Sequence, residues 1–177
     1  MDKTQQSHNN NSSTPKDVSG INLVTALNPK VIEALASTIK EAKIRGLNVA
    51  LHSGVRLAEE QEKLYRLGRT VMNPDGKTKE KPLGNIITNA RAYESWHSFG
   101  LAVDVVFKDA KGWTWNKTPK EWGELGEIGE MFGFSWGGQW TKFPDYPHFQ
   151  VIGKLKNVQQ AKALLLEKGI EEVWSHV

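Results

Sequence analysis

The chain has 177 residues, of which 38% are hydrophobic and 24% are charged, and this is the composition of an ordinary globular protein with one domain. It contains no cysteine, which excludes disulfides, thiol nucleophiles and iron–sulfur clusters and leaves histidine and carboxylate as metal ligands. The net charge of +3 is too small to indicate a nucleic-acid partner, and no apolar run approaches the roughly 18 residues that span a membrane.

Residues 1–20 are polar and rich in asparagine and serine, with no Leu, Ile or Phe among them. Such a segment cannot bury enough apolar surface to offset the entropy of ordering. We therefore expect a disordered tail over residues 1–20 and one folded domain over residues 21–177. The tail also lacks the apolar region of a secretory signal.

Four segments have the apolar spacing and the end signals of helices. Asn28 precedes Pro29, which is the pattern of an N-cap followed by proline at the first helical position. Thr118 precedes Pro119 in the same way, and Glu121 completes the spacing of a capping box. The predicted helices cover residues 28–46, 58–67, 119–132 and 158–168.

Short strands are predicted over residues 47–53, 101–107, 134–136, 147–152 and 170–174. Residues 69–95 contain two prolines, two glycines and many charges, which is typical of a long loop, and long ordered loops are often functional. Helices beside short strands indicate an α+β fold: a small antiparallel sheet flanked by helices in a single domain.

The predicted strand over residues 101–107 contains a carboxylate among Leu, Ala, Val and Phe. Strand periodicity puts Asp104 on one face with Ala102 and Val106, where an unpaired carboxylate costs several kcal/mol. Asp104 therefore needs a cation, which is either a metal ion or an arginine such as Arg56 or Arg91. Gly100 lets the chain turn before the strand and brings His97 back toward Asp104. The alternative for His97 is a capping or turn histidine.

A second group of polar residues precedes and opens the strand predicted over residues 147–152. His148 is either a half-buried strand residue or a ligand, and Asp145 stands on the turn before it. His97, Asp104 and His148 form a donor set that suits Zn²⁺ and leaves a fourth position for water. Asp145 is placed to accept the proton of that water and to pass it to a leaving amine.

Three ordered motifs resemble those of the zinc peptidases of the D-Ala-D-Ala carboxypeptidase family, which includes VanY-type and VanX-type enzymes and the L-alanyl-D-glutamate endopeptidases. The resemblance covers residues 29–152. The motifs are Ser95-x-His97-x-x-Gly100-x-Ala102-x-Asp104, Trp136-Gly137-Gly138-x-Trp140 and Asp145-x-x-His148-Phe149, and a further segment, Ser53-Gly54-Val55-Arg56 with Gln61 after it, is similar to an upstream family segment.

The resemblance implies a role for each matching residue. It implies one zinc ion per chain on His97, Asp104 and His148, with Asp145 as general base and acid. It also implies substrate binding by three residues: Arg56 as a clamp on a carboxylate or carbonyl, Ser95 and Gln61. Arg56 could instead form a surface ion pair with Glu59 or Glu60, and Ser95 could be a simple turn residue.

The activity implied by the resemblance is hydrolysis of an amide bond in the peptide stem of bacterial peptidoglycan. An aspartate at position 145 is more similar to the L-Ala–D-Glu endopeptidases than to the dipeptidases. The alternatives are a D,D-carboxypeptidase or dipeptidase acting on D-Ala-D-Ala, a non-catalytic zinc-bearing cell-wall-binding module, and a glycan-binding domain that uses the tryptophans. We expect a monomer without membrane insertion that acts on the cell wall, released by phage lysis or after loss of a signal.

Two positions depart from the family pattern. Val55 stands where the family usually has an aromatic residue, and Gln139 stands where an acidic residue is expected. The predicted loop over residues 69–95 is longer than a connection requires, and it is where we expect substrate choice to reside. His52 is expected to have a structural role, and most of the seven tryptophans to lie in the core or in a pocket wall.

Overall fold

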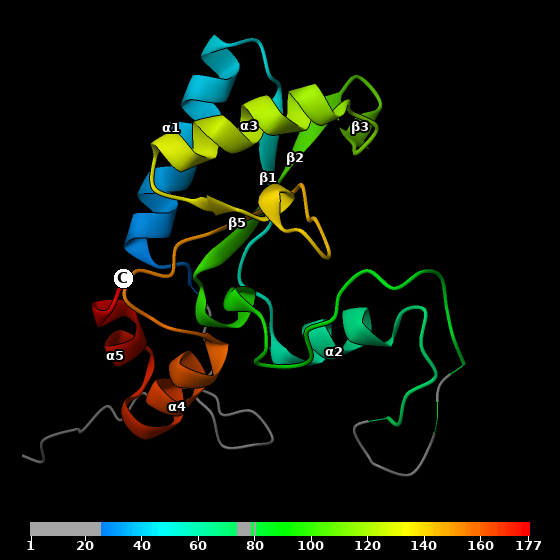
Figure 1. Ribbon diagram of the computed structural model, residues 1–177, viewed down its shortest axis with the longest axis vertical. Helices are drawn as coiled ribbons and strands as arrows, with labels where there is room; N and C mark the ends of the chain where they lie inside the picture. The colour runs from blue at the N-terminus through cyan, green and yellow to red at the C-terminus, as the bar shows by residue number, and fades with distance from the viewer. Residues whose placement is uncertain (1–25, 74–78, 80) are drawn as a thin grey trace, which may run out of the picture.

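The computed structural model describes residues 26–73, 79 and 81–177, so the tail predicted over residues 1–20 lies outside the described residues. None of the helices in this described part is long and apolar enough to cross a membrane. The elements in chain order are α1 (Pro29–Ile44), β1 (Val49–Ser53), α2 (Ala58–Arg66), the 3₁₀ helix η1 (Trp96–Phe99), β2 (Ala102–Asp109), β3 (Gly112–Thr114), α3 (Pro119–Met131), β4 (Ser135–Trp136), the 3₁₀ helix η2 (Gly137–Gln139), β5 (His148–Gln150), α4 (Val158–Lys168) and α5 (Ile170–Ser175) (Figure 1).

The strands form one antiparallel sheet with the order β1-β2-β5-β4, and β3 pairs with the far end of β2. The α+β fold with a small antiparallel sheet and flanking helices is therefore confirmed. β2 is the central strand, because it pairs with β1 on one edge and with β5 and β3 on the other. Residues carried by β2 consequently lie in the middle of the molecule.

The two faces of β2 have different surroundings. Val103, Val105 and Phe107 are buried in the main core, together with apolar residues of α1 and α3. These two helices pack against each other, and α3 crosses α1 in Figure 1. Asp104 and Val106 alternate with the core residues and line a cavity on the opposite face. We call this second face the open face of the sheet.

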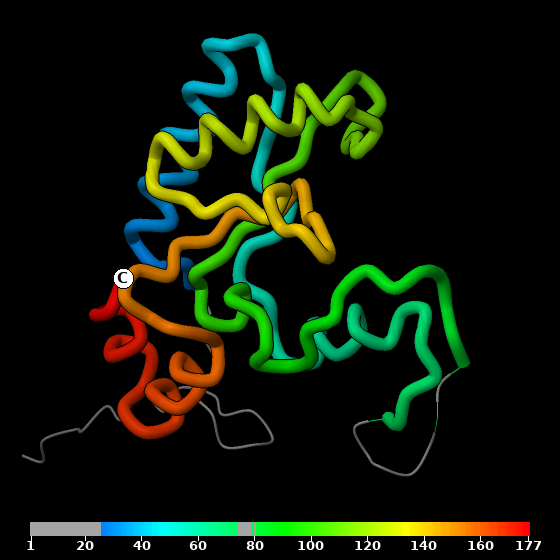
Figure 2. The backbone as a smooth tube through the Cα atoms, in the orientation of Figure 1, coloured from blue at the N-terminus to red at the C-terminus, as the bar shows by residue number. Residues whose placement is uncertain are grey.

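A second, smaller core joins the C-terminal helices to η1. Phe99 and Leu101 are fully buried there against Leu165 of α4 and Val173 of α5. The indole nitrogen of Trp174 donates a hydrogen bond of 2.8 Å to the backbone carbonyl of Phe99. This packing fixes η1 against α4 and α5. In contrast, α2 and the segment that precedes η1 project away from the sheet (Figure 2).

The helix starts predicted from the sequence are confirmed. The side chain of Asn28 accepts a hydrogen bond from the backbone N–H of Lys30. Thr118 and Glu121 each accept from the backbone N–H of the other, which is the capping box.

The strand predicted over residues 170–174 is wrong, because this segment is helix α5. Gly169, at φ +88°, ends α4 and begins α5, so the chain turns without a linker long enough to reach the sheet. Ile170, Val173 and Trp174 have the spacing of one helical face and pack against the second core. Short apolar segments of this kind fit both periods, and packing against α4 decides between them.

Candidate active site

His97, Asp104 and His148 converge on the open face from three different elements. Asp104 and His148 are directly opposite in the β2–β5 ladder, so their side chains are neighbours on the same face. His97 lies on η1, which ends at Gly100 in the left-handed conformation at φ 67°. A Cβ at Gly100 would lie 2.3 Å from the backbone oxygen of Ala26, so only glycine fits this turn.

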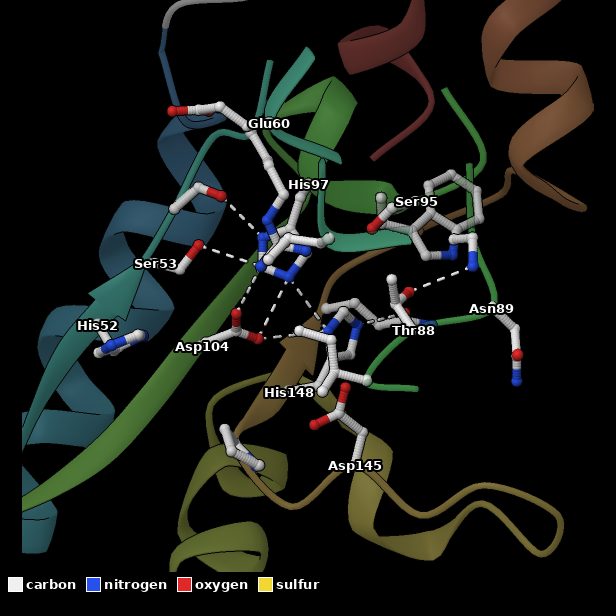
Figure 3. Close-up of a pocket in the computed structure, with 18 of the residues that line it drawn as sticks. His52, Ser53, Glu60, Thr88, Asn89, Ser95, His97, Asp104, Asp145 and His148 are labelled. Atoms are coloured by element: carbon white, nitrogen blue, oxygen red, sulfur yellow. Dashed lines mark hydrogen bonds and ion pairs between the residues drawn. The ribbon is translucent and has the colours of Figure 1, made fainter. Parts of the chain in front are cut away.

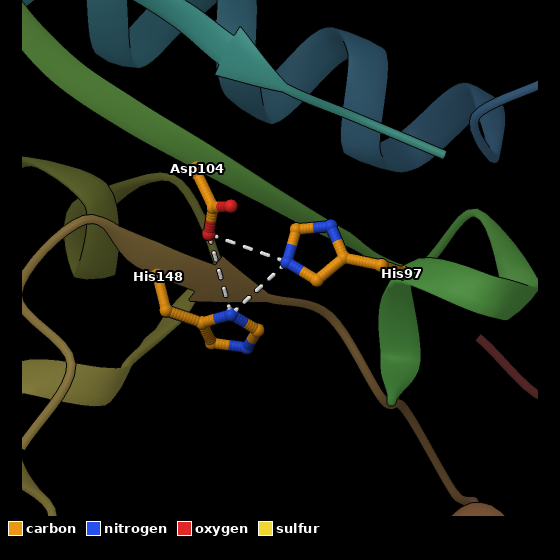
Figure 4. A group of neighbouring side chains, drawn as sticks. All are labelled: His97, Asp104 and His148. Atoms are coloured by element: carbon orange, nitrogen blue, oxygen red, sulfur yellow. Dashed lines mark hydrogen bonds and ion pairs between the residues drawn. The ribbon is translucent and has the colours of Figure 1, made fainter. Parts of the chain in front are cut away.

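The ligand atoms of the three residues, which we call the metal cluster, form a tight triangle (Figure 4). Nε2 of His97 lies 3.2 Å from Oδ1 of Asp104 and 3.2 Å from Nδ1 of His148, and the third side, from Nδ1 of His148 to Oδ1 of Asp104, is 3.6 Å. Ligands about 2.0–2.1 Å from a tetrahedral zinc ion lie about 3.3 Å from one another. Both the donor atoms and their separations fit zinc.

Each histidine is oriented by an acceptor on its other ring nitrogen. Nδ1 of His97 lies 2.7 Å from the carbonyl oxygen of Gly54, and Nε2 of His148 lies 2.9 Å from Oε1 of Gln150. When these nitrogens carry the proton, Nε2 of His97 and Nδ1 of His148 present lone pairs to the cluster. Sequence reasoning missed Gln150, although its position two residues after His148 on one strand face was a usable signal.

Asp104 also forms the arginine pair that the sequence offered as an alternative. Nη2 of Arg56 donates a 2.8 Å hydrogen bond to Oδ2 of Asp104, while Oδ1 faces the two imidazoles. Burial raises the pKa of the Asp104 carboxyl, but when His97 and His148 are protonated their charge and hydrogen bonds outweigh burial and hold the pKa well below its ordinary value. Asp104 is therefore a carboxylate that can face a metal ion and a guanidinium together.

Arg56 is held in place from behind by Gln61. Nη1 of Arg56 donates to Oε1 of Gln61 over 3.0 Å, and Nε2 of Gln61 donates to the carbonyl of Ala90 over 2.7 Å. Gln61 is fully buried and contacts Arg56, so its side chain does not reach the cavity. Arg56 pairs with Asp104 and not with Glu59 or Glu60.

Asp145 lies on the turn before β5, and its carboxylate points into the cavity beside His148 (Figure 3). Burial raises the pKa of the Asp145 carboxyl; the charge of His148 opposes this, the charge of Asp104 adds to it, and His97 and Arg56 have smaller lowering effects, so the pKa lies above its ordinary value. Gly137 approaches this turn so closely that an added Cβ would lie 2.7 Å from the Asp145 carbonyl oxygen. The Trp-Gly-Gly motif is thus the support of the turn that carries Asp145.

The metal cluster and Asp145 lie in a cavity of about 1230 Å³. Its floor is the open face of the sheet, and its rim includes Ser95, Ile87 and Trp140. Trp140 contacts the His148 ring, with 5.0 Å between the ring centroids. The cavity exceeds the roughly 300–1,000 Å³ of common small-molecule sites, so it is large enough for an extended ligand.

Comparison with known proteins identifies relatives over part of this chain. A family model described as D-alanyl-D-alanine carboxypeptidase matches residues 88–151. The peptidoglycan L-alanyl-D-glutamate endopeptidase CwlK of Bacillus subtilis is 35% identical over 131 residues, which are 69% of this chain and 72% of that protein. The chain belongs to the D-alanyl-D-alanine carboxypeptidase family.

Two further matches are a second curated relative and a solved structure of the same fold. An L-alanyl-D-glutamate peptidase of a Listeria phage is 33% identical over 76 residues, which are 42% of this chain and 27% of that protein. A crystal structure of a mutant of the D,D-pentapeptidase VanY in complex with Zn(II) shares the fold, with a TM-score of 0.50 and 18% identity over 90% of this chain and 87% of that chain.

Membership of the D-alanyl-D-alanine carboxypeptidase family makes the protein a hydrolase of the peptidase class. Peptidases of this family depend on zinc, and the matched segment contains the metal cluster and Asp145. Arg56 and Gln61 lie before the matched segment. Of the two departures from the family pattern, Val55 lines the cavity and packs against the second core, whereas Gln139 is in η2.

Proposed function

We propose that this protein hydrolyses the amide bond between L-alanine and D-glutamate in the peptide stem of bacterial peptidoglycan, through a peptidase domain over residues 21–177 that holds one zinc ion on His97, Asp104 and His148. One observation carries this proposal. The metal cluster has a further carboxylate, Asp145, beside it in the same cavity, in a chain whose relative CwlK is named for that bond.

The reaction needs a nucleophile, a stabilised oxyanion and a proton for the leaving group. Zinc in this site would lower the pKa of a water molecule toward about 7 and polarise the alanine carbonyl. Asp145 accepts the proton as the water oxygen bonds to the carbonyl carbon, and then donates it to the glutamate nitrogen as the C–N bond breaks. A carboxyl whose pKa is raised suits both halves of this transfer.

Arg56 is proposed to bind a carboxylate of the substrate. Three of its five N–H groups donate to Gln61, Ser53 and Asp104, which fixes the guanidinium plane at the cavity wall. Two N–H groups remain for a ligand, and D-glutamate supplies a carboxylate next to the scissile bond. We propose that Gln61 acts by positioning Arg56, and that Ser95 contacts the substrate from the rim.

The size of the cavity favours an endopeptidase over a carboxypeptidase or dipeptidase. A terminal D-Ala-D-Ala dipeptide would fill a small part of about 1230 Å³, whereas a stem peptide cut in its interior extends on both sides of the metal cluster. All site residues come from one chain, so a monomer is sufficient. The proposed substrate also places the action of the protein at the cell wall.

Mass spectrometry of purified peptidoglycan stem peptides after incubation with the protein tests the proposal. We expect products in which D-glutamate has a free amino group, and we expect a chelator to abolish them and added zinc to restore them. The variant Asp145→Asn, which keeps the shape of the side chain, should retain bound zinc but lose activity by at least about 100-fold. Release of terminal D-Ala would instead establish a carboxypeptidase, and zinc binding without cleavage a binding module.

A further inference from the structure

Two tryptophans stand exposed at the far end of the open face. Trp113 is 41% exposed and Trp115 is 50% exposed, although indole rings bury large areas wherever a core accepts them. Trp113 lies on β3 opposite Lys108, and Trp115 follows β3 directly. Trp115 lines the same cavity as Asp104, so an exposed indole belongs to the surroundings of the metal cluster.

His52 fixes the orientation of both indoles. The β1–β2 register shifts between Leu51 and Ser53, so His52 is the extra residue of a β-bulge. Bulges redirect side chains, and here both His52 and Ser53 line the cavity where strict alternation would put them on opposite faces. The His52 ring meets Trp113 and Trp115 edge-on, with centroids 5.1 Å and 5.2 Å apart and interplanar angles of 90° and 83°.

Of the two rings, Trp115 is the one available to a ligand. The ammonium group of Lys108 lies over one face of the Trp113 ring, 4.9 Å from its centroid, and Trp113 does not line the cavity. Trp115 keeps half of its surface free and is held by His52 from the side. A half-exposed indole in a cavity wall, with one edge against a neighbouring ring, offers a flat face on which a ligand can stack.

The two amino acids at the scissile bond have no group that fits such a surface. L-alanine offers a methyl group and D-glutamate a carboxylate, whereas a pyranose ring offers a flat face of C–H groups that can stack on an indole. The stem of peptidoglycan is attached to an N-acetylhexosamine through the amino end of this alanine, by a lactyl bridge. A sugar ring therefore accompanies every intact substrate close to the scissile bond.

The distances agree with this arrangement. Continuing the β2–β3 register from Phe107 and Thr114 sets Trp115 opposite Val106, two residues along and one strand across from Asp104. Strand geometry makes this separation about 8 Å. The alanine and the lactyl bridge, which has the same backbone length, together span about 7 Å when extended.

We propose that Trp115, held by His52, is a sugar-binding subsite that stacks on the N-acetylhexosamine ring to which the stem peptide is attached. This inference rests on the proposed function and extends its substrate from the peptide to the glycan-linked peptide. Trp115 is then a specificity residue for substrates that still carry their sugar.

Cleavage of two matched substrates tests the subsite. One is the stem peptide linked to its disaccharide, and the other is the free stem peptide. Stacking of one ring predicts that kcat/KM of the wild type is about two- to tenfold higher for the linked substrate. Trp115→Ala should lower kcat/KM for the linked substrate more than for the free peptide and so remove this preference, Trp115→Phe should retain part of it, and Phe132→Ala, which removes an exposed aromatic ring outside the cavity, should change neither value.

Binding of the disaccharide alone provides a readout that does not need activity. In NMR spectra, the indole N–H signal of Trp115 is identified as the one that disappears in Trp115→Ala. Adding the disaccharide to the wild type should shift this signal. Equal cleavage of both substrates by the wild type, or equal loss on both in Trp115→Ala, would overturn the subsite while leaving the peptidase intact. Cleavage of neither substrate would contradict the proposed function, and the indole shift would then decide the subsite by itself.

Discussion

Each histidine of the metal cluster presents a different ring nitrogen, and the acceptor behind it sets which one. For His97 the acceptor is a backbone carbonyl, which no substitution of a side chain removes. For His148 it is the side chain of Gln150, so this half of the arrangement can be tested by mutation.

We predict that Gln150→Ala lowers the affinity for zinc by about 10- to 100-fold, because the His148 ring loses the acceptor that fixes its orientation. Competition with a chromophoric chelator measures this affinity. Gln160→Ala is the matched control, since Gln160 accepts a backbone N–H at the start of α4, remote from the cluster. Equal zinc affinities of the two variants would disprove the role of Gln150.

A single glycine supports the turn that carries Asp145. In Gly137→Ala the new methyl group would meet the Asp145 carbonyl oxygen at 2.7 Å and the His148 Cβ at 3.1 Å. We predict a loss of about 1–3 kcal/mol in the free energy of unfolding, together with a loss of peptidase activity. Urea denaturation measures the first and cleavage of stem peptide the second.

The control for this substitution is Gly123→Ala, in the interior of α3. No atom lies within 4 Å of the position that its Cβ would take. Because alanine favours a helix over glycine, this variant should gain about 0.5–1 kcal/mol. A Gly137→Ala variant as stable as the wild type would show that the turn can relax.

At the scale of elements, one ion pair fastens α2 to the segment before η1. Glu62 of α2 accepts a hydrogen bond of 2.5 Å from Arg91 and a second from the backbone N–H of Ala92. Burial raises the pKa of Glu62, but the Arg91 hydrogen bond and charge, the Ala92 N–H and the charge of Arg66 outweigh it, so the pKa lies below its ordinary value.

A lowered pKa in the folded state means that the unfolded chain binds the proton more tightly. The stability that Glu62 contributes is therefore complete above its unfolded pKa, near 4.5, and is lost as the pH falls through the lower folded pKa. We predict that Glu62→Gln lowers Tm at pH 7 and that its difference from the wild type shrinks as the pH falls below 4.5. Glu127→Gln, on the exposed face of α3, should show no such convergence in the same calorimetric series.

The elements that the sequence predicted correctly are those with local signals. Asn28 and Thr118 mark helix starts through contacts within three residues, and Asp104 is conspicuous in an apolar strand. The same local reasoning failed for residues 170–174, where packing against α4 selects a helix over a strand. Local reasoning also could not predict the direction of the His52 side chain, because the bulge in β1 follows from pairing with β2 and not from the sequence of β1.

The identity of some site residues could be predicted from the local sequence, whereas their positions depend on contacts with distant segments. His97, Asp104 and His148 could be grouped from their residue types and from the resemblance to the family. Their separations of 3.2–3.6 Å, however, depend on the register of β2 with β5. The burial of Gln61 behind Arg56 depends on the Ala90 carbonyl, which belongs to a segment far along the chain.

At the scale of the whole molecule, a bound metal ion would cross-link the sheet to η1. A ligand that binds only the folded state stabilises it, by about 2.7 kcal/mol when its free concentration is 100 times Kd. We predict that zinc raises Tm of the wild type and that a chelator reverses the increase, as measured by scanning calorimetry. His148→Ala should have a Tm that neither zinc nor the chelator changes, and an equal zinc effect on this variant would place the ion elsewhere.

The sheet order also determines when a newly made chain can become active. β2 carries Asp104 early, but His148 is at the start of β5, which is the last strand in the chain and inserts between β2 and β4. His148 is therefore synthesised after His97 and Asp104, and the metal cluster lacks a ligand until β5 pairs with β2. A nascent chain therefore has no hydrolytic centre until its final strand has docked, which keeps a partly synthesised peptidase inert.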